Sequence, residues 1–469
     1  MNAHLAALVA LAPLTLAACA TAPVGEAEAI STRIARDLGA SPIWARDEAA
    51  TAAARARVAT LLAEPVSADT AVQIALINNP RVTAAFESLG IARADFLDAV
   101  TPPAPSLHLL ELNSKDGHSS ALTYGAGFDL LALLSLPASV RAGDGAWEAA
   151  RARAIAEMLE VAAGARASWI DYARARQSAD LTTQAAQAAA GSAAAADALL
   201  AAGNIAQVER DREALYAAEI DIANVQAQAE LVPAREHLIA ALGLRPDQAN
   251  LLQDLERLPA PPEAPIAIPD LEARVAAAST DLAVATGILE AARAETSFSW
   301  LTSLLPGLSL EAEREREDGE WKEGLGISWI LPIFDLGGAD RLRRASESRR
   351  AAALAEALQL EIRSEARVRL AQAEAARQIA FTRRALILPL SADVFDGAVR
   401  DFNAMEIGIL QLLQERRARL DAGRAAIAAV SDYWHAQARL DLLLAGGRTD
   451  GPADAPQSSS DARASDPGH

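Results

Sequence analysis

Histidine, carboxylate and hydroxyl side chains do most of the catalysis and metal binding in proteins, and here they follow no catalytic spacing. The 469 residues contain no phosphate-binding loop G-x-x-x-x-G-K-[ST], no nucleophile motif G-x-S-x-G and no evident paired-carboxylate constellation. No histidine pair has the H-E-x-x-H or a similar ligand spacing. Apart from His4, the histidines are His108, His118, His237, His435 and His469. The sequence therefore predicts a protein that is not an enzyme and that has no metal site or bound cofactor.

The single cysteine, Cys19, is the residue best placed for a covalent modification. Leu5 to Leu16 form an apolar stretch of signal-peptide length, too short to span a bilayer, and Ala17 and Ala18 follow it directly. This is similar to a bacterial lipobox, in which the cysteine sulfur is acylated. Ala20, where an aspartate would favour inner-membrane retention, favours the outer membrane. A cleaved signal with an incidental cysteine is the alternative, since the first four residues carry no lysine or arginine.

The charge balance excludes one class of partner. The formal net charge is −19 and the pI is near 4.8, whereas a nucleic-acid interface needs a basic stripe to neutralise phosphates. The excess of acid fits either a solvated surface or a cation-attracting lumen.

Long helices are predicted by the composition. Aromatic residues make up only 4%, while alanine, leucine, glutamate and arginine crowd long stretches with almost no glycine or proline. No stretch beyond the amino terminus approaches the ~18 consecutive apolar residues of a transmembrane helix. If the chain crosses a membrane, we expect strands to do so.

The same pattern occurs twice along the chain. A shift of 201 residues places Asp69 on Asp270 and Pro105 on Pro306. Each copy is predicted to contain a helix, a strand, a turn, a strand, a very long helix, a bend and a returning helix. The predicted ranges of the first copy are a helix at 71–99, a polar turn at 113–120, a helix at 138–201 and a return ending at Gly243; those of the second are a helix at 271–297, a charged turn at 314–320, a helix at 341 to about 400 and a return ending at Gly446.

The predicted strands alternate in polarity. Leu122, Tyr124, Ala126 and Phe128 alternate with small or polar residues, and so do Leu325, Ile327 and Trp329 in the fourth strand. Strands of ~9–11 residues with this period and with aromatic residues towards their ends match the lipid-out, lumen-in pattern of an outer-membrane barrel. A half-buried antiparallel sheet of a soluble protein has the same alternation and is the alternative.

These features resemble the TolC family of outer-membrane efflux channels, from Asp69 to Gly446. The helix opening at 71–80 is similar to the family's A-x-x-A-L-x-x-N-P entry, and Leu331–Gly337 is similar to its P-[LI]-F-D-x-G exit from strand to helix. The residues before Pro137 in the first copy depart from that exit pattern. The bend at Ala202–Ile205 carries the resemblance as well. The expected organisation is a lipoprotein signal peptide at 1–18, an N-terminal tether at 19–68, a first efflux repeat at 69–245, a Pro-rich linker at 246–269, a second efflux repeat at 270–446 and a disordered tail at 447–469.

The resemblance implies a mainly α fold with a small β part. It implies a homotrimer whose long antiparallel helical hairpins form an α-barrel, while four strands per chain contribute to a 12-stranded transmembrane β-barrel. It implies a passive duct of a tripartite efflux system, working with a periplasmic adaptor protein and an inner-membrane pump. The expected adaptor-docking residues at the two bends are Gly203, Asn204, Ile205, Ile407, Gly408, Ile409 and Leu410.

Several alternatives stay open. Gly203 and Gly408, where we expect the backbone to reverse, are also simple helix-capping residues. Asp401 and Glu406 are candidates for a pore constriction of symmetry-related carboxylates, or else lie on solvated helix faces. A periplasmic scaffold or adaptor built from helical hairpins is the alternative function. The segment Asp432–His435 resembles a branch found in metal-tolerance clusters, although its residues show no metal handling.

Overall fold

The computed structural model describes residues 24–113, 120–252, 255–317, 320–331 and 336–448. They form two compact units, which are described separately. The strand unit comprises the described residues of 24–27, 86–154 and 282–361, and the hairpin unit comprises those of 28–85, 155–281 and 362–448. Each unit takes segments from both sequence repeats, so the repeats are interleaved rather than folded one after the other.

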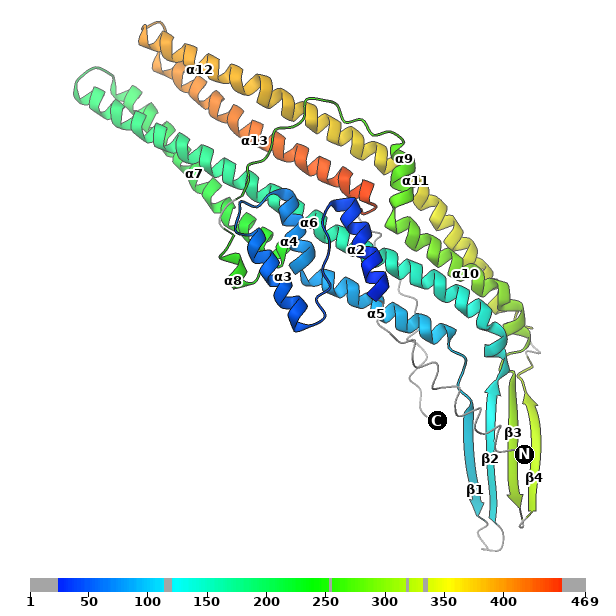
Figure 1. The fold of residues 1–469 in the computed structure, drawn as a ribbon. Helices are drawn as coiled ribbons and strands as arrows, with labels where there is room; N and C mark the ends of the chain where they lie inside the picture. The colour runs from blue at the N-terminus through cyan, green and yellow to red at the C-terminus, as the bar shows by residue number, and fades with distance from the viewer. Residues whose placement is uncertain (1–23, 114–119, 253–254, 318–319, 332–335, 449–469) are drawn as a thin grey trace. The chain divides into compact units, whose positions relative to one another are not determined.

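A four-stranded antiparallel sheet forms one part of the strand unit (Figure 1). Its strands are β1 (Ser106–Asn113), β2 (Ser120–Asp129), β3 (Ser309–Glu317) and β4 (Glu320–Ser328), and they lie in the order of the sequence. The central pairing of β2 with β3 joins the hairpin of one repeat to that of the other. This confirms the predicted strand pairs and adds their order.

Helices from both repeats pack closely in the strand unit. They are most of α5 (Pro80–Val100), the first part of α6 (Leu130–Ala201), most of α10 (Thr280–Leu304) and the first part of α11 (Gly338–Thr382). Helices α6 and α10 touch through Gly145 and Gly287, where a Cβ at Gly145 would lie 2.6 Å from the carbonyl oxygen of Gly287. The absence of side chains at this pair lets the two backbones meet.

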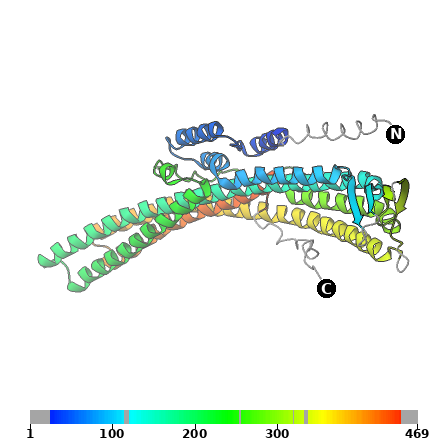
Figure 2. The same ribbon diagram turned by 90° about the horizontal axis from the view of Figure 1, so that it is seen from below.

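Two antiparallel helical hairpins make up most of the hairpin unit. The first joins α6 to α7 (Gln207–Leu242), and the second joins α12 (Leu388–Asn403) to α13 (Ile409–Ala445). Figure 2 shows the paired helices in a second view. An apolar cluster holds α13 against α6 and α7, with Arg416 3.7 Å from the carboxylate of Glu213 and Arg417 bound to Glu219. The cluster consists of Ala189, Tyr216, Ile220, Leu413 and Leu420.

The helix predicted at 71–99 is broken in the structure. It forms α4 (Ala68–Asn78) and α5, with Asn79 extended between them, because a residue before proline disfavours the helical region and Pro80 follows. The helix predicted at 271–297 is broken in the same way into α9 (Leu271–Ala278) and α10, although no proline is present. In both repeats the break faces the glycine that ends the returning helix.

Two other predicted boundaries and the regularity of one predicted helix are corrected. Helix α6 begins at Leu130 rather than Ala138, because Asp129 caps it by accepting a hydrogen bond from the Ala132 amide at 2.9 Å. Strand β3 runs to Glu317, so the charges placed in a turn at 314–320 largely belong to a strand. The long helix of the second repeat contains a π-helical turn at Arg383–Ile387, directly before Pro389.

The Pro-rich linker is fixed to the hairpin unit. After the short α8 (Pro246–Ala249), the Arg377 side chain donates hydrogen bonds to the carbonyls of Pro262 at 3.1 Å and Glu263 at 2.9 Å. The Glu374 carboxylate accepts from Arg377 and from the Ile266 amide at 2.9 Å. These two contacts hold the pKa of Glu374 down at about 2.

This pairing predicts a pH dependence. The folded pKa of Glu374 lies below its ordinary value of 4.5, so its stabilisation is complete above about 4.5 and is lost as the pH falls towards about 2. We expect Glu374→Gln to lower the thermal unfolding midpoint at pH 7, with the difference from wild type shrinking as the pH falls through that window. Glu361→Gln, an exposed position on the same helix, should show no such pH-dependent difference. A constant difference between wild type and Glu374→Gln from pH 7 to 2 would contradict this origin.

The segment predicted as a tether contains α2 (Val24–Leu38) and α3 (Glu48–Leu61). Ile30 and Ile34 of α2 are fully buried, and Arg33 donates to the Ala278 carbonyl at 2.8 Å. Most of this segment is therefore part of the packed structure. Cys19, the signal peptide and nearly all of the predicted tail lie outside the described residues.

Within the described residues, no single helix has both the length and the apolar composition needed to cross a bilayer. The broken pair α9 and α10 meets that length and composition requirement only when the two are taken together.

Candidate channel surfaces

One face of the sheet is apolar across all four strands. The strand register places Leu107, Ala126, Ala312 and Leu325 in one row across the sheet. Phe128, Leu310 and Ile327 form the neighbouring row. Leu107 and Leu325 are each 82% exposed in a single chain. An apolar face this exposed is stable only against lipid or another protein.

The opposite face carries small and charged residues. Its rows contain Gly125 beside Glu313 and Gly127 beside Glu311. The His108 ring lies over Gly125 and reaches Glu313 on the next strand but one, with Nε2 3.2 Å from the carboxylate. Gly125 leaves the space that this ring needs. The predicted alternation of apolar and small or polar residues is thereby confirmed at the level of faces.

Aromatic side chains border the apolar rows at both ends of β4. Trp321 is its second residue, and Trp329 follows its last residue. They are eight positions apart, or about 26 Å along the strand at ~3.3 Å per residue, which at a strand tilt of ~40° spans roughly 20 Å of the ~25 Å lipid-facing band of a membrane barrel. Tyr124 packs edge-on against Trp321 with ring centroids 5.5 Å apart.

The first helical bend has the geometry predicted for a glycine. Gly203 has a φ of +75°, and its amide bonds to the Leu200 carbonyl while the Asn204 amide bonds to Leu199, both at 2.9 Å. These two bonds form the Schellman motif that ends a helix. Asn204 is exposed and Ile205 is half-buried.

The second bend differs from the prediction. Met405, rather than Gly408, has the left-handed conformation, with a φ of +62°, and it stands where Gly203 stands in the first bend. The same two hydrogen bonds form, from Met405 to Phe402 and from Glu406 to Asp401. Gly408 is extended and precedes α13 as its N-cap. The expectation that the backbone reverses at Gly408 was therefore wrong.

The remaining predicted docking residues fall into two groups. Ile409 packs against the apolar cluster that holds the hairpins together, and Ile407 is half-buried. Leu410 is 49% exposed and Met405 is 93% exposed. Met405 was not among the predicted docking residues, and the repeat shift of 201 residues places Gly203 on Ala404 rather than on Met405.

The two candidate constriction residues lie at this second bend. Asp401 is in the last turn of α12, and Glu406 follows the helix. Both side chains are exposed. A carboxylate in the last turn of a helix opposes the helix dipole, which favours cations there. Local helix stability therefore does not account for Asp401.

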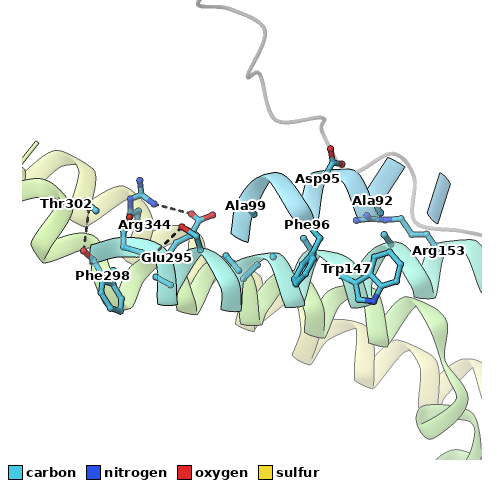
Figure 3. A pocket seen from close by; sticks show the side chains of 18 residues that line it. Ala92, Asp95, Phe96, Ala99, Trp147, Arg153, Glu295, Phe298, Thr302 and Arg344 are labelled. Carbon is cyan, nitrogen blue, oxygen red and sulfur yellow. Dashed lines mark hydrogen bonds and ion pairs between the residues drawn. The ribbon is translucent and has the colours of Figure 1, made fainter. Parts of the chain in front are cut away.

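A groove of about 640 Å³ lies within the strand unit, lined by α5, α6, α10 and α11 (Figure 3). Its walls are mainly alanine and aromatic side chains, among them Phe96, Trp147 and Phe298. Glu295 and Arg344 pair with each other at 3.2 Å. No histidine or cysteine is among the described residues that line the groove.

The segment Asp432–His435 contributes to packing. Tyr433 is buried, and the Trp434 indole donates to the Pro259 carbonyl at 2.9 Å. His435 Nε2 lies 3.0 Å from the Asp171 carboxylate, and this hydrogen bond lowers the pKa of Asp171.

No protein-family model matches the chain. Over 386 residues it is 24% identical to the cobalt-zinc-cadmium resistance protein CzcC of Cupriavidus metallidurans, covering 81% of this chain and 90% of that protein.

Solved structures give a consistent result. The outer-membrane protein VceC of Vibrio cholerae matches with a TM-score of 0.68 at 16% identity, over 81% of this chain and 96% of VceC. The CmeC outer-membrane channel of Campylobacter jejuni matches with a TM-score of 0.67 at 14% identity, over 81% of this chain and 85% of CmeC. CusC matches with a TM-score of 0.69 at 15% identity, over 81% of this chain and 92% of CusC. The chain therefore has the fold of TolC-family outer-membrane channels, which confirms the fold predicted from its sequence.

Proposed function

We propose that the chain is the outer-membrane channel subunit of a tripartite efflux system, a passive trimeric duct extending into the periplasm. The observation that carries this proposal is the sheet with one exposed apolar face and one glycine- and glutamate-bearing face. Four strands are too few to enclose a lumen, which needs about eight or more. Three chains supply twelve strands. A periplasmic scaffold would leave the apolar face in water, which disfavours that alternative.

Two exposed apolar stripes support closure into a ring. One lies on α7 at mainly seven-residue spacing and consists of Val208, Leu215, Ile222, Val225 and Val232. The other, called the second-hairpin stripe, runs from the end of α11 through the π-helical turn into α12 and consists of Ile379, Leu386, Leu390 and Val394. All nine side chains are more than half exposed. Because the stripes lie on different helices, pairing one with the other joins copies head to tail and closes a ring.

The two stripes lie at similar distances from the helical bends and are flanked by opposite charges. Leu215 lies about eleven residues after the first bend and Val394 about eleven before the second, or roughly 16 Å along each helix. Arg416 and Glu213 lie at similar distances from their bends and pair with each other within the chain. This pairing places the two bends at about the same height along the hairpins. Asp221 flanks the first stripe, and Arg384 flanks the second at a similar level.

This seam predicts a specific cross-link. In a chain whose only native cysteine is Cys19, Leu215→Cys combined with Val394→Cys should form covalent dimers and trimers on oxidation, because the two positions share a level. Leu215→Cys combined with Ile379→Cys is the control, since about fifteen residues, or roughly 22 Å of helix, separate Ile379 from Val394. Non-reducing electrophoresis measures both. Equal cross-linking of the two pairs would exclude this register.

The helical bends are proposed as the site where a periplasmic adaptor docks, with an inner-membrane pump as the energy source. Met405 supports this assignment, because a fully exposed apolar side chain in a strained conformation does not serve folding.

A substitution of Met405 tests adaptor docking independently of folding stability. Met405→Gly should raise the thermal midpoint, because a left-handed non-glycine residue costs ~1–2 kcal/mol, and should still weaken capture of the adaptor. Site-specific cross-linking to the adaptor measures the second effect. Unchanged capture, with unchanged efflux, would show that the tip does not use this side chain.

Threefold symmetry would arrange Asp401 and Glu406 as rings of carboxylates that attract cations. Single-channel recording of Asp401→Asn and Glu406→Gln tests this: loss of cation preference supports the rings, and an unchanged preference excludes them.

Cys19 is proposed to carry the lipid anchor, so labelled palmitate should label the wild type and not Cys19→Ser.

Divalent metal cations are the proposed cargo. The similarity to CzcC and the glutamates of the inner sheet face support this assignment. Deletion of the gene should lower the tolerated concentration of cobalt, zinc or cadmium, and the wild-type gene should restore it. If the deletion left metal tolerance unaltered and lowered tolerance to organic toxins instead, the metal cargo would be wrong. The channel proposal would be unaffected by that result.

A further inference from the structure

The apolar sheet face ends in a cationic aromatic cluster near the β3–β4 connection. On this face, strand register places Arg314 beside Tyr124 in the first row beyond that of Leu325, and Arg316 beside Trp321 in the second. The guanidinium of Arg314 lies 4.7 Å from the centre of the Trp321 ring, and that of Arg316 lies 5.6 Å from the same ring. Two guanidiniums therefore lie within cation–π range of one indole, at the end of the face whose middle rows are apolar.

The two arginines differ in their ionic partners. Arg314 lies 3.2 Å from the carboxylate of Glu323. Among the described residues, the ring of Trp321 is the contact found for Arg316, and its side chain is exposed. Glu111 shares its row but lies on β1, two strands away, or roughly 10 Å at ~4.8 Å per strand. Within the part of the chain that the structure describes, Arg316 therefore has no carboxylate partner at the border of the apolar face.

The border position identifies the kind of ligand. Trp321 lies four residues, or ~13 Å along the strand, from Leu325 at the middle of the apolar span. At a strand tilt of ~40° this is a depth of ~10 Å, within a few Å of the edge of the ~25 Å lipid-facing band. Tryptophan and tyrosine rings sit at that boundary in membrane proteins. Arginine matches the geometry of phosphate oxygens there, and stacking on the indole holds its planar group in place.

We propose that Arg316, supported by Trp321 and Arg314, binds the phosphate of an anionic lipid headgroup at the outer edge of the membrane-embedded sheet. This inference rests on the proposed function, because it requires the apolar face to contact lipid. Each trimer would present three such sites, one on each chain. Bound headgroups would then tie the outer rim of the barrel to the surrounding leaflet.

The test uses the intact trimer in phosphatidylcholine vesicles, with and without lipid A, a glycolipid that carries two phosphates. Lipid A should raise the temperature at which the wild-type trimer dissociates, and native mass spectrometry should detect it on the particle. Arg316→Gln should weaken lipid A binding roughly fivefold per site, in line with the contribution of one arginine at a charged surface. Lys322→Gln, on the opposite face of the sheet, is the matched control and should bind as wild type does.

The outcomes separate the possible partners. Lipid A with its phosphates removed should not stabilise the wild type; equal stabilisation would overturn the phosphate site. If Glu111→Gln abolishes the effect of Arg316→Gln on trimer stability, a neighbouring chain's carboxylate, not lipid, is the partner and the inference fails. Conducting trimers that ignore lipid A contradict this inference alone, whereas a failure to form conducting trimers in any vesicle contradicts the channel proposal.

Discussion

Gly446→Ala is expected to destabilise the protein by about 2–5 kcal/mol, the sum of ~1–2 kcal/mol for a left-handed non-glycine residue and ~1–3 kcal/mol for overpacking. Gly446 ends α13 with a φ of +99°. A Cβ there would collide with the carbonyl oxygen of Ala278, at the break between α9 and α10. Neither backbone can yield easily, because the Gly446 carbonyl accepts hydrogen bonds from the Thr280 amide at 2.9 Å and from its hydroxyl at 2.8 Å.

The first repeat contains the same junction, which supports this reasoning. Gly243 has a φ of +65°, and a Cβ there would lie 2.7 Å from the Cα of Asn79. Asn78 donates from its side chain to the Gly243 carbonyl at 2.6 Å. Each returning helix therefore ends on the broken helix that opens its own repeat, and glycine is required at both meeting points.

Gly191→Ala is the matched control. Gly191 lies within α6, with nothing near the position of an added Cβ, so the substitution should gain about 0.5–1 kcal/mol. Thermal unfolding of the detergent-extracted proteins compares the two variants. Equal midpoints for Gly446→Ala and Gly191→Ala would show that the junction is not as tight as described.

Leu325→Arg should abolish assembly of the channel in the membrane. Leu325 lies midway between Trp321 and Trp329 on the apolar face and is 82% exposed in the single chain. An arginine facing lipid near the midplane costs ~2–4 kcal/mol, and a trimer would bear that cost three times. We expect most of the heat-sensitive trimer band to disappear from the outer-membrane fraction.

Gly326→Arg provides the control one residue away. Its side chain would lie on the opposite face, in open space beside Glu311, where a positive charge finds a partner. We expect this variant to retain its trimers and to change ion preference instead. If both variants assembled equally well, the apolar face would not contact lipid.

The pattern of alternating polarity was sufficient to predict the sheet faces, because the side-chain period of a strand is fixed at two. The doubled order of elements likewise followed from the punctuation by glycine and proline. Strand β3 was harder to bound: its alternating glutamates and arginines have the composition of a turn, and only pairing with β2 and β4 makes them a strand. Tertiary pairing overrides local composition in such a segment.

The helix breaks and the second bend show what local patterns miss. The break at Ser279 has no proline to mark it and depends on Gly446, a residue distant in sequence. At the second bend, a glycine in the right region suggested the left-handed position, yet Met405 occupies it. The position of the left-handed residue is set by where α12 ends, because the hydrogen bonds of the motif connect to carbonyls of its last turn. The sequence did not locate that helix end to within three residues.

Cryo-electron microscopy of the detergent-extracted particle tests the central claim most directly. The account predicts three chains around one axis, with the apolar sheet faces outward in a twelve-stranded barrel and the α7 stripe of each chain against the second-hairpin stripe of the next. A particle that contains a single chain, stable in water without detergent, would contradict it.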